Sequence, residues 1–202
     1  NQKIKNILIT STSEVYGSAK YLPIDEDHPL NAQSPYAASK IAADQIALSY
    51  FRSFKTPVKI IRPFNTYGPR QSERAIIPRI IIQCLQNNNK KIKLGNLKPS
   101  REFNYIEDTC EAYFNVLNNS KLIGEVVNVG SDTNISILNL VKKIQKILGT
   151  NSIITQEKEI IRPKQSEVTN LRCNNKKLKK FCSWRPKTNL DKGLIKTIKW
   201  FS

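Results

Sequence analysis

The sequence predicts an α/β fold whose first part is a parallel sheet crossed by a helix. A short apolar run from Ile7 to Ile9 indicates a buried strand, and a second buried strand is predicted over residues 58–62. A helical pattern lies between them, and Pro57 ends it a short distance before the second strand. The order strand, helix, strand is the unit from which parallel sheets are built.

The first half of the chain gives clear element boundaries. The first strand is predicted over residues 4–10, because its apolar run leads directly into serines and threonines, and a loop follows to about residue 33. The helix begins at Ser34 and Pro35, since serine is favoured at the N-cap and proline in the first turn. Its predicted apolar face consists of Ile41, Ala42, Ile46, Ala47, Tyr50 and Phe51.

Helices dominate the pattern after Pro63. The clearest lies between Ser136, a capping residue, and Gly149, which is typical of a helix end. Two further helices are predicted at about residues 76–85 and 190–201, and another begins at Glu107 and Asp108. Short strands are predicted over residues 92–94, 102–105 and 125–129.

Composition narrows the functional classes. The 202 residues include 33 Lys and Arg against 16 Asp and Glu, a net charge of +17. The densest basic runs, at residues 87–91 and 174–180, carry no interleaved aromatic residues, so we interpret them as solvated faces and expect no nucleic-acid partner. No apolar run reaches the roughly 18 residues of a membrane span, so no membrane association is expected.

Several absences are equally informative. The sequence has no Met and begins at Asn1, which suggests a fragment. Its seven glycines are too far apart for a G-x-G-x-x-G loop, so the chain carries no complete nucleotide-phosphate cradle. The four cysteines form no C-x-x-C pair and His28 is the only histidine, which excludes a zinc-finger pattern. Free thiols favour a reducing, cytoplasmic compartment, and no metal site is expected.

Candidate chemistry gathers where the two predicted strands end. The first strand leads into Thr12-Ser13-Glu14, and the second into a segment rich in hydrogen-bonding side chains that contains Asn65. Ligands of open parallel sheets bind beyond these carboxyl ends. The helix between the strands carries Tyr36 and Lys40 four residues apart, hence on one face. A nearby ammonium stabilises a phenolate, so this pair predicts a tyrosine that acts as a base.

These motifs together resemble a known family. Tyr36-x-x-x-Lys40 with upstream Thr12 is similar to the catalytic trio of extended short-chain dehydrogenase/reductases, and Thr12-Ser13-Glu14-Val15-Tyr16-Gly17 resembles the nucleotide-sugar 4,6-dehydratases, most closely those of legionaminic-acid-type sugar biosynthesis. Further matching stretches follow in the family's order. They are residues 62–70, residues 101–108, Arg162-Pro163 and Glu167-Val168.

The resemblance implies an architecture and partners. We expect a Rossmann-like parallel sheet, its C-terminal portion only, with a smaller α+β substrate-binding domain. Residues 1–70 would complete the NAD-binding domain, residues 71–202 would form mainly the nucleotide-sugar domain, and about 107–130 would return to the sheet. The family's Gly-rich NAD loop is missing, so the chain resembles a C-terminal fragment. The full-length protein is expected to be a homodimer.

The resemblance also implies roles in a dehydration. Tyr36 would remove the proton of the sugar 4-hydroxyl while hydride passes to NAD, with Lys40 supporting Tyr36 and holding the cofactor. Thr12 would hydrogen-bond the 4-oxygen, and Glu14 would take the C5 proton. Ser13 stands where many relatives have an aspartate that protonates the leaving hydroxyl, so Glu14, with or without Ser13, or water would supply that proton.

Substrate and cofactor contacts are expected further along the chain. A nucleotide sugar presents a diphosphate, which guanidinium groups bind through charge-assisted and often bidentate hydrogen bonds. The candidate substrate-binding residues are Asn65, Arg70, Arg101 and Arg162. Pro63, at a strand end, is expected beside the nicotinamide of NAD.

Other activities remain open at this point. A UDP-glucuronate decarboxylase shares the Thr-Ser-Glu stretch, and a 4-epimerase shares Tyr36 and Lys40 but does not need Glu14. A truncated, non-catalytic nucleotide-sugar-binding module is a further alternative, because the Gly-rich segment is absent.

Overall fold

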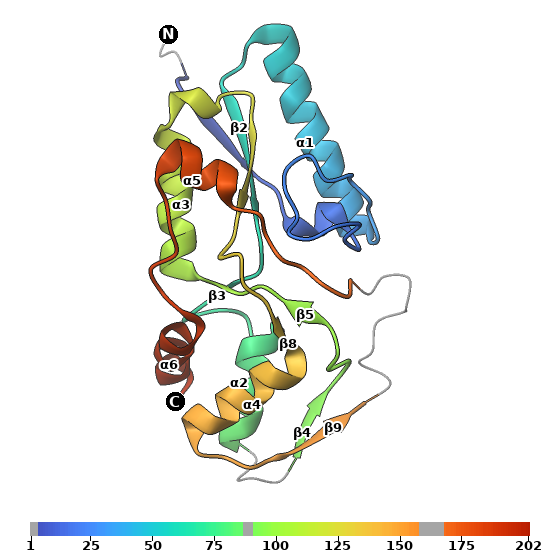
Figure 1. Cartoon of the computed structure of the whole chain (residues 1–202), viewed down its shortest axis with the longest axis vertical. Coiled ribbons are helices and arrows are strands. Elements are labelled where there is room, and N and C mark those ends of the chain that lie inside the picture. Colours follow the sequence, from blue (N-terminus) through green and yellow to red (C-terminus); the bar gives the residue numbers. More distant parts are fainter. Residues whose placement is uncertain (1–3, 87–90, 158–167) are drawn as a thin grey trace.

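A three-stranded parallel sheet, ordered β1–β2–β7, forms one half of the molecule. The computed structural model describes residues 4–86, 91–157 and 168–202. The elements of this half are β1 (Ile7–Thr10), η1 (Ser13–Tyr16), α1 (Pro35–Phe54), β2 (Val58–Pro63), α3 (Ile106–Asn118), η2 (Ser120–Leu122), β7 (Val126–Val129) and α5 (Lys176–Cys182). Helix α1 covers one side of the sheet, and α3 and α5 lie on the other (Figure 1). The predicted α/β class is confirmed.

Helix α1 starts where the sequence predicts. The Ser34 hydroxyl accepts a hydrogen bond from the backbone N–H of Ala37 at 3.1 Å, and Pro35 occupies the first turn. Its predicted apolar face is wrong in part, because Ile46 and Tyr50 are 60% and 53% exposed. Asp44 is fully buried instead, since its carboxylate is paired with a buried arginine. A charge that is paired inside the protein escapes a hydrophobic-periodicity argument.

Strand β2 lies in the centre of the sheet and is buried along its length up to Pro63. It carries two basic side chains into the interior. Lys59 donates hydrogen bonds to Asn6 Oδ1 at 2.8 Å and to the Leu117 carbonyl at 2.6 Å, near the end of α3. Burial lowers the pKa of Lys59. The second basic residue, Arg62, is likewise hydrogen-bonded inside the protein. Buried charges require such partners.

The other half of the molecule packs three helices around one apolar core. Its elements are β3 (Thr66–Tyr67), α2 (Ile76–Gln86), β4 (Lys91–Leu94), β5 (Ser100–Arg101), β6 (Asn104–Tyr105), β8 (Ile135–Ser136), α4 (Ile137–Leu148), β9 (Ile153–Gln156) and α6 (Leu190–Phe201). The helices α2, α4 and α6 contact one another, and Ile80, Leu140 and Leu194 are fully buried between them. Two-residue and four-residue strand pairs complete this half, including the parallel pair β4–β9 (Figure 1).

Most predicted elements are confirmed, and one strand is wrong. The helices expected at about residues 76–85, 136–149 and 190–201 match α2, α4 and α6. The strand expected over residues 102–105 is shorter than predicted, because β6 covers only Asn104–Tyr105 and Glu102 and Phe103 belong to no strand. The Glu102 carboxylate accepts hydrogen bonds from the backbone N–H groups of Asp132 and Cys173, in other segments of the chain. The division into two domains at about residue 70 stays a prediction.

None of the helices in the described part of the chain combines the length and apolar character that a bilayer-spanning segment needs.

Candidate active site

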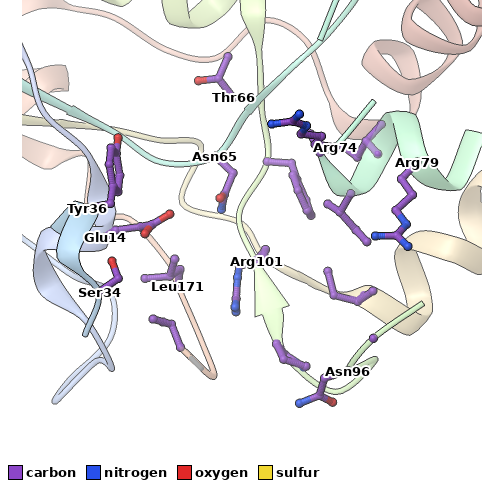
Figure 2. Close-up of a pocket in the computed structure, with 18 of the residues that line it drawn as sticks. Glu14, Ser34, Tyr36, Asn65, Thr66, Arg74, Arg79, Asn96, Arg101 and Leu171 are labelled. Atoms are coloured by element: carbon purple, nitrogen blue, oxygen red, sulfur yellow. The ribbon is translucent and has the colours of Figure 1, made fainter. Parts of the chain in front are cut away.

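A cavity of about 990 Å³ lies at the junction of the two halves. Residues from many separate segments line it, including η1, the start of α1, the segment after β2, α2, and the ends of β4 and β5. Four of the residues singled out from the sequence meet there, namely Glu14, Tyr36, Asn65 and Arg101 (Figure 2). Residues 14 and 101 come from opposite halves of the molecule, so the fold brings the expected chemistry and binding groups together.

Glu14 reaches the cavity from the short 3₁₀ helix η1, which the sequence patterns did not reveal. Thr12 caps this helix, and its Oγ1 accepts a hydrogen bond from the Glu14 backbone N–H at 3.2 Å. A 3₁₀ helix has three residues per turn, so successive side chains point in different directions. Ser13 is therefore buried, and neither Thr12 nor Ser13 is among the residues that line the cavity.

Tyr36 enters the cavity from the first turn of α1 and is 49% exposed. The Lys40 ammonium lies 5.9 Å from the centre of the Tyr36 ring, on the same helix face. Lys40 itself donates a hydrogen bond to the Thr10 carbonyl at 3.0 Å, which ties α1 to the end of β1. The ammonium is thus held close to the phenol without being part of the cavity wall.

Asn65 and Arg101 stand on the other side of the cavity from Tyr36 and Glu14 in Figure 2. The Asn65 side-chain amide donates to the Glu102 carbonyl at 3.0 Å, and the Asn104 backbone N–H donates to the Asn65 carbonyl at 2.8 Å. Asn65 is thereby fixed to the segment that carries Arg101. The Arg101 Nη1 donates to the Ser100 carbonyl at 3.1 Å.

Glu102 is a buried residue that the sequence analysis missed. Its carboxylate accepts backbone hydrogen bonds from Cys173 at 2.7 Å and from Asp132 at 3.2 Å, so it joins three segments behind the cavity wall. Burial raises the pKa of Glu102 to about 7, although these backbone donors act in the opposite direction. The sequence analysis selected the adjacent Arg101 as a substrate-binding residue. That selection gave no reason to expect a buried carboxylate at the next position.

Two other predicted residues, Arg70 and Pro63, are not among those that line the cavity. The Arg70 guanidinium lies 5.1 Å from the centre of the Trp200 ring, against α6, and Arg70 does not line the cavity. Pro63 ends β2 opposite Val129 of β7. Arg162 lies outside the described residues.

Two arginines that the sequence analysis did not select line the cavity instead. Arg74 precedes α2 and Arg79 lies within it, and Figure 2 shows both at the end away from Tyr36 and Glu14, with Arg101 between the two groups. Arg79 is the only charged residue in the apolar stretch from Ile76 to Ile82. The sequence therefore contained a sign that Arg79 could be functional, because an unpaired arginine is unusual in an apolar stretch of a helix.

Among the described residues, the cavity thus combines one carboxylate and a phenol at one end with three guanidinium groups beyond them. This arrangement suits proton transfer on an uncharged part of a substrate whose remainder is anionic. The chain belongs to the family described as GDP-mannose 4,6 dehydratase, which matches residues 1–197.

Individual relatives catalyse several reactions. The chain is 36% identical over 201 residues to the dTDP-D-glucose 4,6-dehydratase of Bos taurus, covering 98% of this chain and 56% of that protein. It is 32% identical over 207 residues to the UDP-N-acetyl-alpha-D-glucosaminuronate decarboxylase of Bacillus cytotoxicus, covering 98% and 64%. The family resemblance expected from the sequence is confirmed, and these relatives include both dehydratases and decarboxylases.

A solved structure adds an epimerase. UDP-glucuronic acid 4-epimerase from Bacillus cereus, determined with UDP-glucuronic acid and NAD, superposes with a TM-score of 0.90 at 29% identity. The match covers 99% of this chain and 62% of the epimerase. The chain therefore spans little more than half the length of the relatives that it matches.

Proposed function

We propose that this chain carries the acid–base and substrate-binding groups of an NAD-dependent nucleotide-sugar 4,6-dehydratase, which forms a 4-keto-6-deoxy sugar nucleotide. The observation that carries the proposal is the convergence of Glu14 and Tyr36 on one cavity whose other wall contains Arg74, Arg79 and Arg101. An epimerase acting at C4 needs a base such as Tyr36 but has no use for a second acid–base group at C5. A carboxylate at this position therefore favours elimination.

The first step in the proposed reaction belongs to Tyr36. Its phenolate removes the proton of the sugar 4-hydroxyl, and the Lys40 ammonium, 5.9 Å from the ring, stabilises the negative charge. The contact of Thr12 with the 4-oxygen stays a prediction, because Thr12 caps η1 and is not among the residues that line the cavity. When bound, NAD would accept the hydride from C4 and, after water is lost, return it to C6 while C5 regains a proton, so that the 4-keto-6-deoxy product forms and NAD is regenerated.

Glu14 carries out the proton transfers that eliminate water. The 4-ketone makes the C5 proton acidic, and the Glu14 carboxylate removes it as the C5–C6 double bond forms. The C6–oxygen bond breaks at the same stage, and the leaving hydroxyl takes a proton to depart as water. Ser13 is buried and outside the cavity wall, so we assign this second proton transfer to Glu14 as well.

The arginines suit the diphosphate of the substrate. Guanidinium groups bind phosphate oxygens through charge-assisted hydrogen bonds, and three of them line the cavity here. Asn65 lies between these arginines and Glu14 in Figure 2, a position from which it can contact the sugar. Arg70 is not part of this proposal, because it lies against Trp200. The predicted place in legionaminic-acid-type sugar biosynthesis, and a role for Arg162, stay predictions.

The residues present fit one end of NAD. Tyr36 is half-exposed, and Lys40 lies near its ring and is bound to the end of β1, which is where parallel sheets bind such ligands. We propose that these two residues and Pro63 hold the nicotinamide end. The sequence contains no Gly-rich loop for the diphosphate of the cofactor. The expected cytoplasmic location and homodimer stay predictions too.

Product analysis tests this function. The complete gene product is incubated with NAD and a panel of nucleotide sugars, and the products are examined by mass spectrometry. Loss of one water supports the dehydratase. Loss of carbon dioxide from a glucuronate substrate would identify a decarboxylase, and an unchanged mass with an inverted C4 an epimerase. Binding of nucleotide sugars with no turnover of any of them would indicate a non-catalytic binding module.

A further inference from the structure

Glu14 and Tyr36 come from different elements, so something must fix η1 and α1 relative to each other. Four polar side chains lie together in the interior of the half that contains the parallel sheet. They are Tyr16, Asp44, Arg62 and Asn128, and each is at most 3% exposed. None of them lines the cavity. We call these four residues the buried network.

The buried network meets α1 at Asp44. Tyr36, Lys40 and Asp44 follow one another at intervals of one helical turn and so share a face of α1. The Ser11 hydroxyl donates to Asp44 Oδ2 at 2.9 Å, one residue after the Thr10 carbonyl that accepts from Lys40. Two successive residues at the end of β1 therefore hold two successive turns of α1.

Arg62 connects this helix to η1. Its Nε and Nη2 donate to Asp44 Oδ2 at 3.0 and 2.9 Å, and its Nη1 donates to the Tyr16 hydroxyl at 2.9 Å. The guanidinium also lies 5.0 Å from the centre of the Tyr16 ring. Tyr16 in turn donates to Asn128 Oδ1 at 2.7 Å, in strand β7. Tyr16 is the last residue of η1, two positions after Glu14.

These contacts favour a geometric role over a purely stabilising one. A buried ion pair is weak evidence for stability, because well-packed apolar residues in its place often leave stability unchanged or improved. The planar guanidinium, however, directs its donors along fixed lines, which no apolar side chain does. Burial raises the pKa of Tyr16, so its hydroxyl stays protonated and continues to donate to Asn128.

We propose that Arg62 is a positioning residue: by holding Asp44 of α1 and Tyr16 of η1 with one guanidinium, it sets Glu14 against Tyr36 across the cavity. The catalytic meaning of this link rests on the proposed function. The link itself is a property of the described contacts and is tested separately.

The structural link is tested on this chain by hydrogen–deuterium exchange, which needs no activity. Tyr16→Phe removes the hydroxyl that joins η1 to Arg62 and keeps the ring. Tyr21→Phe is the matched control, because it removes a phenol hydrogen bond to Asp25 at 2.6 Å outside the buried network. We expect faster exchange over residues 12–17 in Tyr16→Phe only. Equal exchange in the two variants would overturn the proposal.

The functional consequence is tested by kinetics on the complete gene product. We expect Tyr16→Phe to lower kcat by about 10- to 100-fold with little change in KM, since a misplaced group costs rate and not binding. NADH should accumulate during turnover. Tyr36 still removes the 4-hydroxyl proton, so oxidation of the sugar by NAD continues, while elimination through Glu14 is slowed. Arg62→Lys, which keeps the charge and loses the fork, should behave in the same way.

The outcomes separate the two proposals. Unchanged kcat and no NADH accumulation in both variants would overturn the positioning role even if exchange increases. A fall in kcat without faster exchange over residues 12–17 would also overturn it. A wild-type protein that transforms no nucleotide sugar overturns the proposed function and the catalytic role of the link together, and the exchange comparison still decides whether Arg62 holds η1.

Discussion

Glu14 and Tyr36 face one cavity although Glu14 belongs to η1 and Tyr36 to the first turn of α1. Because the two side chains come from different elements, a substitution of one can affect its own proposed step without removing the other residue. Tyr36→Phe removes the base for the first step, so both NADH formation and product should fall by about 10²- to 10⁴-fold. Rapid-scanning absorbance of NADH checks this, with the substrate-binding affinity as the control for folding. Product formation at the wild-type rate would contradict the role of Tyr36.

Arg101 should matter for substrate affinity. Hydrogen bonds to charged groups contribute about 1.5–3 kcal/mol, so Arg101→Met should weaken nucleotide-sugar binding by about 10- to 100-fold. Isothermal titration calorimetry measures this directly. Arg70→Gln is the matched control, because Arg70 lies against Trp200 and not in the cavity. A larger loss in Arg70→Gln than in Arg101→Met would refute this placement of the diphosphate.

Glu102 should make the fold more stable at acidic than at neutral pH. Burial raises its pKa from 4.5 to about 7, so between these values the folded chain binds more protons than the unfolded chain. The free energy of unfolding therefore falls as pH rises from about 4.5 to about 7, by roughly 3 kcal/mol at most.

Urea unfolding of wild type and Glu102→Gln at several pH values measures this contribution. The glutamine variant should lose this part of the pH dependence, whatever its absolute stability. Identical slopes of unfolding free energy against pH in the two proteins would show that Glu102 does not titrate in this range.

The exposed side of α1 offers a test of the expected homodimer. Ile46, Tyr50 and Phe54 follow at one-turn intervals and are 60%, 53% and 73% exposed. If this strip is a subunit contact, Ile46→Asp should shift the complete gene product toward monomer in sedimentation experiments. Ile195→Asp on α6, at a site 54% exposed, is the control and should not. A dimer that persists unchanged in Ile46→Asp would place the contact elsewhere.

Local signals allowed much of the fold to be predicted. Ser34 and Pro35 mark the start of α1, and Ser136 and Gly149 mark the ends of α4, because caps depend on a few neighbouring residues. The basic run at residues 174–180 contributes most of α5, and its Leu178 is fully buried in the core behind the sheet. A single apolar residue among lysines gives too little periodicity to predict a helix.

Long-range contacts explain the features of the fold and of the site that could not be predicted from the sequence. Asp44 is buried because Arg62, 18 residues away, is paired with it, and for that reason the predicted apolar face of α1 is wrong in part. Glu102 is buried because its carboxylate binds the backbone of Asp132 and Cys173, which lie 30 and 71 residues further along the chain. In the site, Glu14 and Tyr36 could be selected from motifs, whereas Arg74 and Arg79 enter the cavity only through the packing of α2.

The role of Glu14 at C5 is tested most directly by turnover in deuterated water. Removal of the C5 proton and its later replacement from solvent-exchangeable groups should place one deuterium at C5 of the dehydrated product, as observed by NMR. Glu14→Gln should form NADH on substrate yet release no dehydrated product. A wild-type product without deuterium at C5, or full dehydration by Glu14→Gln, would contradict the assignment.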